Sequence, residues 1–137
     1  MYKVKFDPSG QPLTINITYF GGCTVSYVYT LWEKKSNAKV DEKSGNNQND
    51  EDDNFNLPSP IVHNDGRIIE IFSTMKNPDS QDAEEIVAIQ VLQGNMVLAR
   101  EGKPLERVRG KEYTVTEKET ILANKTTLND PFIMLVV

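Results

Sequence analysis

The chain has 137 residues, of which 38% are hydrophobic and 26% charged, and its formal net charge is −5. These values are typical of one globular domain and exclude a disordered or collagen-like chain. No apolar run approaches the roughly 18 residues of a membrane-spanning helix, and the opening residues lack the apolar stretch of a secretory signal. We therefore expect a cytoplasmic protein without a membrane partner, and the alternative is a secreted protein that has lost its leader.

The first third of the chain predicts three strands, at residues 2–6, 13–19 and 23–31. In each run apolar residues alternate with mostly polar ones, and β-branched and aromatic residues are frequent, as half-buried strands require. A three-residue loop at 20–22 would pair the second and third runs as a hairpin. All the apolar partners would then share one face, with Tyr27 and Tyr29 toward the core. The alternative is that these two strands lie in different sheets.

Residues 33–60 predict one long polar loop. Six acids and one base fall between positions 41 and 56, so this segment carries the whole net charge and the rest of the chain is balanced. Loops of this length inside a compact domain are usually functional or disordered. A neutral body with one acidic segment lacks the concentrated basic surface that nucleic acids require, so we expect no nucleic-acid partner.

The second half predicts further short strands and turns. A two-residue turn, Gly94-Asn95, would pair Gln93 with Met96 in a hairpin over 86–100 and bring Met96 to the inner face. A short helical turn is expected near 79–85. The remaining strands are predicted at 67–73, 105–109, 112–116, 120–124 and 132–137, and the remaining turns at 64–66, 77–78 and 129–131.

About eight or nine short strands with closely spaced turns predict a single all-β domain over residues 1–137, an antiparallel β-sandwich. Its type would be immunoglobulin-like, fibronectin-like or jelly-roll. Cys23 is the only cysteine, so no disulfide can join the two sheets as it does in antibody domains.

Aromatic residues at exposed positions are the main indication of a binding surface. Phe20 falls at the tip of the predicted hairpin and Trp32 on its outer, threonine-rich face. Phe55, in the long loop, is the third candidate binding residue. The alternative is that the other sheet, or the loop through Phe55 and Leu57, covers Phe20 and Trp32. Exposed Phe and Trp are typical of an anchor for a protein partner or of a stacking platform for a sugar ring.

The acidic run suggests calcium as the one candidate cofactor, because calcium needs several oxygen ligands on a flexible loop. Asp50, Asp52 and Asp53 would supply them. The EF-hand spacing fails, since Phe55 stands where that loop needs glycine and Ile61 where it needs glutamate. A solvated charge run is the simpler interpretation.

The sequence contains no complete catalytic motif, so we predict no catalytic residues and a protein that is not an enzyme. A less favoured hypothesis is a hydrolase, in one form of which Cys23 would be the nucleophile and His63, the only histidine, its general base. The favoured prediction is a non-enzymatic binding or assembly module that uses the first hairpin and the acidic loop, with an unknown protein or a second copy as partner. The alternative is a carbohydrate- or calcium-binding sandwich.

Overall fold

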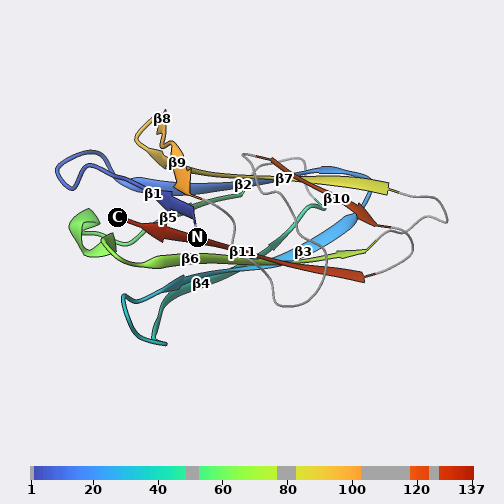
Figure 1. Cartoon of the computed structure of the whole chain (residues 1–137), viewed down its shortest axis with the longest axis horizontal. Coiled ribbons are helices and arrows are strands. Elements are labelled where there is room, and N and C mark those ends of the chain that lie inside the picture. Colours follow the sequence, from blue (N-terminus) through green and yellow to red (C-terminus); the bar gives the residue numbers. More distant parts are fainter. Residues whose placement is uncertain (1, 49–52, 77–82, 103–117, 124–126) are drawn as a thin grey trace.

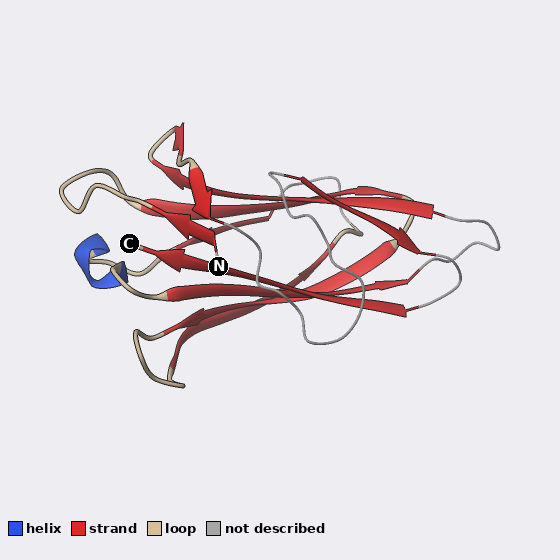
Figure 2. Cartoon of the chain, viewed as in Figure 1, coloured by secondary structure: helices blue, strands red, loops and turns tan. Residues whose placement is uncertain are grey.

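The computed structural model describes residues 2–48, 53–76, 83–102, 118–123 and 127–137. Within these ranges the chain forms eleven strands and one short 3-10 helix. The strands build two sheets that pack face to face as two layers (Figure 1). The helical segment lies at one end of the sandwich (Figure 2). The predicted all-β sandwich is confirmed, and its immunoglobulin-like or jelly-roll type stays a prediction.

One sheet has six strands, in the spatial order β4 (Lys39–Asn46), β3 (Thr24–Trp32), β6 (Ile68–Lys76), β11 (Thr127–Val136), β1 (Tyr2–Val4) and β9 (Arg100–Gly102). The other has five, in the order β10 (Lys118–Ala123), β7 (Ala83–Gln93), β2 (Leu13–Gly21) and β5 (Asp53–Asn56), with β8 (Met96–Val97) beside β7. The 3-10 helix η1 spans Ile61–Asn64. Every described strand pair is antiparallel except β1 with β11, which is parallel.

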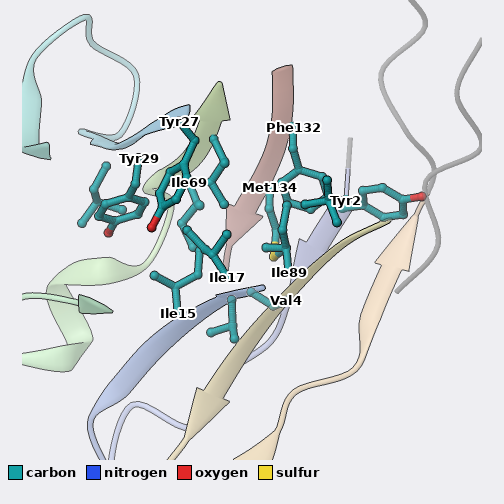
Figure 3. Close-up of a cluster of buried hydrophobic side chains, with 14 of the residues drawn as sticks. Tyr2, Val4, Ile15, Ile17, Tyr27, Tyr29, Ile69, Ile89, Phe132 and Met134 are labelled. Atoms are coloured by element: carbon teal, nitrogen blue, oxygen red, sulfur yellow. The ribbon is translucent and has the colours of Figure 1, made fainter. Parts of the chain in front are cut away.

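The interior is built by the inward half of each alternating strand. Ile15 and Ile17 of β2 gather with Tyr27 and Tyr29 of β3 between the sheets (Figure 3). Each of these four side chains is at most 3% exposed. Burying one aliphatic side chain contributes about 1.5–3 kcal/mol, so this alternation is the main reason the two sheets pack.

The predicted hairpin over residues 13–31 is wrong. β2 pairs with β5 and β7, whereas β3 pairs with β4 and β6, so the chain crosses from one sheet to the other at Gly21-Gly22-Cys23. Thr14, Asn16 and Thr18 therefore share no face with Trp32. The inward orientation of Tyr27 and Tyr29 is correct, since either arrangement buries the same alternate residues.

The predicted loop over 33–60 is also wrong at two of its segments. β4 and β5 lie within it, and they form the edges of the two sheets on the same side of the sandwich. Edge strands face water along one side, so they lack the regular apolar alternation that reveals inner strands. Lys39 pairs with Glu42 at 2.6 Å and Lys43 with Asp41 at 3.5 Å, and such charges discourage further strand pairing.

Two smaller predictions need correction, and others are not tested. Residues 83–85 of the expected helical turn belong to β7, and 79–82 lie outside the described residues. The turn expected at 129–131 is part of β11. The strands at 105–109 and 112–116 and the turn at 77–78 lie outside the described residues.

The hairpin at Gly94-Asn95 is confirmed in register, because Gln93 pairs with Met96. Gly94 has φ 61°, which suits the first central position of a type II′ turn. Met96, however, is 61% exposed although its partner Gln93 is buried, while Leu98 is buried. Met96 directly follows the turn at the end of the hairpin, so its position in the register does not bury it.

Candidate binding surfaces and the cluster beneath them

Phe55 belongs to an aromatic cluster between the sheets and not to a binding surface. Its ring stacks on Tyr29 at a centroid distance of 5.4 Å and meets the Tyr27 ring edge-on at 6.4 Å. Tyr27 also packs against Tyr19, with centroids 5.5 Å apart. Phe55 is half-buried and sits on the inward side of β5, opposite Ile15. It therefore covers interior residues and neither Phe20 nor Trp32.

Asp53 takes part in the same cluster. The Tyr27 hydroxyl donates a short hydrogen bond to its Oδ2 atom. Burial, and then this bond to a carboxylate, raise the pKa of Tyr27 well above its ordinary value. Gly45 of β4 leaves the space for the pair, since a Cβ there would clash with the Tyr27 ring and lie 2.7 Å from Asp53 Oδ2.

The calcium prediction gains no support from this geometry. Asp50 and Asp52 lie outside the described residues, and the carboxylate of Asp53 accepts the bond from Tyr27. In the ranges that the structure describes, no three His, Cys, Asp or Glu side chains are grouped as a metal ion would need.

A polar cluster that the sequence did not predict links the two ends of the predicted long loop through hydrogen bonds. Arg67 donates to both carboxylate oxygens of Glu33 at 3.3 Å and to Asn64 Oδ1 at 2.9 Å. Asn64 is fully buried and donates to the Pro58 carbonyl at 3.0 Å. The bonds from Arg67, followed by that from the Lys34 amide, lower the pKa of Glu33. Because these partners are remote in sequence, no local pattern predicts the cluster.

Cys23 and Glu85 form a buried polar contact at the crossover. The Cys23 amide donates to Glu85 Oε2 at 3.0 Å, and Glu85 is fully buried. Its Oε1 atom has no hydrogen-bond partner within the described part of the chain. Burial raises the pKa of Glu85, and burial together with the nearby carboxylate raises that of the Cys23 thiol. A thiol of raised pKa is a poor nucleophile at neutral pH.

The proposed couple of Cys23 with His63 is not formed. Cys23 precedes one end of β3, and His63 lies in η1, which leads into β6 where Ile68 pairs with Trp32 at the other end. The nine residues of β3 separate these ends by about 26 Å, at roughly 3.3 Å per residue. The thiol version of the hydrolase hypothesis is therefore wrong.

The six-stranded sheet carries an unexpected apolar surface on its outer side. Val28 of β3 and Phe72 of β6 are register partners, and they are 37% and 41% exposed. Half-buried apolar side chains from β3, β6 and β11 extend this surface, and Thr30 and Glu70 lie between its Val28–Phe72 row and its Trp32–Ile68 row. We call the apolar set the outer apolar face, formed by Val28, Trp32, Ile68, Phe72, Ile133 and Leu135. Apolar residues at the outward positions of an alternating strand were the sequence signal for Val28 and Phe72.

Trp32 lies on this face, as predicted for an outer position. It is half-buried, and the Lys39 ammonium sits 5.8 Å from its ring centroid as a cation–π contact. Phe20 lies elsewhere, at the end of β2 on the outer side of the five-stranded sheet, where it pairs with Ile86 and is 53% exposed. The predicted binding residues Phe20, Trp32 and Phe55 thus occupy three different environments.

The outer side of the five-stranded sheet is polar and carries a ladder of hydrogen bonds. Asn16 Nδ2 donates to Asn54 Oδ1 at 3.0 Å, and the Thr18 hydroxyl donates to Asn16 Oδ1 at 3.2 Å. The Thr14 hydroxyl donates to Asn56 Oδ1 at 3.1 Å. Gln90 of β7 stands beside Asn16 in register. We call these residues, Thr14, Asn16, Thr18, Asn54, Asn56 and Gln90, the amide face.

Comparisons with protein-family models, with curated proteins and with solved structures found no match to this chain. No helix within the described ranges has the length and apolar character needed to cross a membrane.

Proposed function

We propose that this chain is a non-enzymatic assembly module that binds a second copy of itself through the outer apolar face. The observation that carries the proposal is the pair Val28 and Phe72, side by side and exposed on the outward side of an antiparallel sheet. That side of such a sheet is normally polar where it faces water. Contiguous exposed apolar side chains are typical of an interface.

The margins of the face are compatible with a second copy as the partner. Each carries both signs of charge, since Glu42 pairs with Lys39 on the β4 side and Lys3 lies beside Glu101 on the β1 side. A two-fold axis parallel to the strands would bring the β4 margin of one copy opposite the β1 margin of the other. The apolar area of the surface can therefore be complementary to itself.

The proposal keeps parts of both predicted binding segments. β3 comes from the predicted hairpin and β4 from the predicted loop, and the structure makes them neighbours in one sheet. Trp32 contributes to the face, with Lys39 over its ring. The absence of catalysis is part of the proposal, and the raised pKa of the Cys23 thiol argues only against a thiol nucleophile.

Light scattering and sedimentation over a range of concentrations test this function. We expect wild-type chain to form dimers and Phe72→Glu to weaken the dimer by at least about tenfold, because the variant buries an unpaired charge. Met96→Glu is the matched control, since Met96 is exposed on β8 of the other sheet and should leave the dimer intact. A wild-type chain that stays monomeric, or a Phe72→Glu variant that dimerises normally, contradicts the proposal.

A further inference from the structure

The amide face combines two properties that point to a specific class of ligand. Its outward side chains are carboxamides and hydroxyls, which each offer donors and acceptors in fixed directions. Across β5, β2 and β7, one row places Asn54, Asn16 and Gln90 side by side. Three neighbouring amides on a rigid sheet form a flat surface ready to exchange hydrogen bonds with a ligand.

Part of this hydrogen-bonding capacity is unused by the protein. The ladder engages Asn16 through both its Nδ2 and its Oδ1 atoms, but engages Asn56 only through its Oδ1 atom. Among the described residues, no side chain bonds the Asn56 amino group or the Gln90 carboxamide. Asn56 is exposed and Gln90 half-exposed, so both groups can reach a ligand.

The face is uncharged over its centre. On either side of the amide row, Thr14 pairs with Leu92 and Thr18 with Ala88, so the neighbouring rows carry hydroxyl and apolar groups. No outward residue of β5 or β2, or of residues 86–92 of β7, is charged. The chain as a whole has a net charge of −5. Lys118 of the neighbouring β10 is the register partner of Ala88. An anionic polysaccharide or a nucleic acid would find no basic group on these stretches of β5, β2 and β7, and an unfavourable overall charge.

An exposed aromatic ring closes one end of this surface. Phe20 follows Thr14, Asn16 and Thr18 on the same side of β2 and is 53% exposed. From Thr14 to Phe20 the strand extends about 20 Å, at roughly 3.3 Å per residue. An aromatic face packs well against the C–H groups of a pyranose ring, while amides and hydroxyls bond the ring hydroxyls.

We propose that the amide face, together with Phe20, is a binding site for a neutral oligosaccharide. The ligand lies along β2, with a sugar ring on Phe20 and its hydroxyl groups bonded by Gln90 and Asn56. The site is on the opposite side of the sandwich from the outer apolar face. Sugar binding therefore does not depend on assembly, and the two proposals can fail separately.

Native affinity electrophoresis tests the site with three probes in the gel: a neutral β-glucan, a neutral galactomannan and polygalacturonate as the anionic comparator. We expect at least one neutral polysaccharide to retard the wild-type chain and polygalacturonate to leave its mobility unchanged. Gln90→Glu should reduce the apparent affinity by at least about tenfold, because a carboxylate has no N–H group to donate to the oxygen atoms of the ligand. Phe20→Ala should weaken binding by a similar factor.

Val62→Ser is the control, since it changes an exposed apolar residue in η1, outside both faces, and should bind like wild type. Thermal unfolding of each variant confirms that the sandwich is intact. The proposal is overturned if neither neutral polysaccharide retards the chain, which leaves the ladder a purely structural feature. It is also overturned if Gln90→Glu binds like wild type, or if Gln90→Glu dissociates a dimer, which assigns this face to self-association.

Discussion

The hydroxyl of Tyr27 donates a hydrogen bond to Asp53, and this bond joins the two sheets of the sandwich. Tyr27 belongs to β3 in the six-stranded sheet, and Asp53 to β5 at the edge of the other. The last acid of the acidic run is thus part of the folded interior. The rings of Phe55 and Tyr19 pack against the ring of Tyr27.

Tyr27→Phe should lower the free energy of unfolding by roughly 1.5–3 kcal/mol, the range for a hydrogen bond to a charged group. The ring packing is kept, but the Asp53 carboxylate loses its donor. Urea unfolding of Tyr27→Phe, Asp53→Ala and the double variant measures the coupling between them, expected at about 1 kcal/mol. Strictly additive losses would show that the bond contributes nothing to stability.

Glu85→Gln should stabilise the protein at neutral pH by about 0.5–2 kcal/mol, because it removes a buried charge and keeps an acceptor for the Cys23 amide. Burial raises the pKa of Glu85 in the folded state, so folded chain binds the proton more tightly than unfolded chain. The contribution of protonated Glu85 to the free energy of unfolding is fully present below the ordinary carboxyl pKa. It is lost as the pH rises through the pKa that Glu85 has in the folded protein. Urea unfolding from acid to neutral pH should show this loss in wild type and not in Glu85→Gln; parallel profiles would contradict it.

Tyr27 and Tyr29 should ionise only as the protein unfolds in alkali. Burial is the main cause that raises the pKa of each, with the Asp53 bond second for Tyr27 and the Asp41 charge second for Tyr29. The stability gained by keeping them neutral is present below the ordinary tyrosine pKa and is lost above it. Tyr27 and Tyr29 are two of five tyrosines, and their share of the tyrosinate absorbance, obtained by difference from Tyr27→Phe and Tyr29→Phe, should change together with the circular dichroism in one late step. Full ionisation with an unchanged dichroism spectrum would refute this.

Asn64→Ala should lower the free energy of unfolding by about 1–3 kcal/mol, since it leaves the Pro58 carbonyl and an Arg67 donor without their partner. Thermal and urea unfolding measure the loss. His63→Ala, next to it but exposed, is the control and should change stability by less than about 0.5 kcal/mol. Equal effects of the two substitutions would mean that the cluster does not fasten this end of the sandwich.

Alternation predicted which side chains turn inward, but it could not predict which strands pair. Ile17 and Tyr27 are buried either in a hairpin or in two facing sheets, because both arrangements use the same period of two. The actual partner of β2 is β7, far along the chain. Strand pairing of this kind depends on contacts between residues far apart in the sequence, and the alternation of apolar residues within one strand does not predict them.

Strands composed mainly of polar residues were the second feature that the sequence pattern did not predict. β4 and β5 were expected to be loop because residues such as Asp41, Glu42 and Asn54 fit no apolar period, yet edge strands favour such residues. Pro131 was expected in a turn for a similar reason. Within β11, only residues 134–136 pair with β1, whereas Pro131 has a described neighbour on one side alone, Phe72 of β6. A proline, which has no amide hydrogen, is tolerated at such a position.

For the candidate site, the sequence identified Phe20 and Trp32 as outward aromatic residues but placed them on one surface. They belong to opposite sides of the sandwich because β2 and β3 belong to different sheets. The amide face was equally hidden, since Asn16, Asn54 and Gln90 become neighbours only through the order of β5, β2 and β7.

The parallel pairing of β1 with β11 has a consequence for how the molecule is made. Tyr2 leaves the ribosome long before its partner Met134 has been synthesised, and β9 pairs with β1 in turn. This margin of the six-stranded sheet therefore closes only when translation has reached the last strand. Until then the six-stranded sheet lacks β11, the strand that joins β6 to β1.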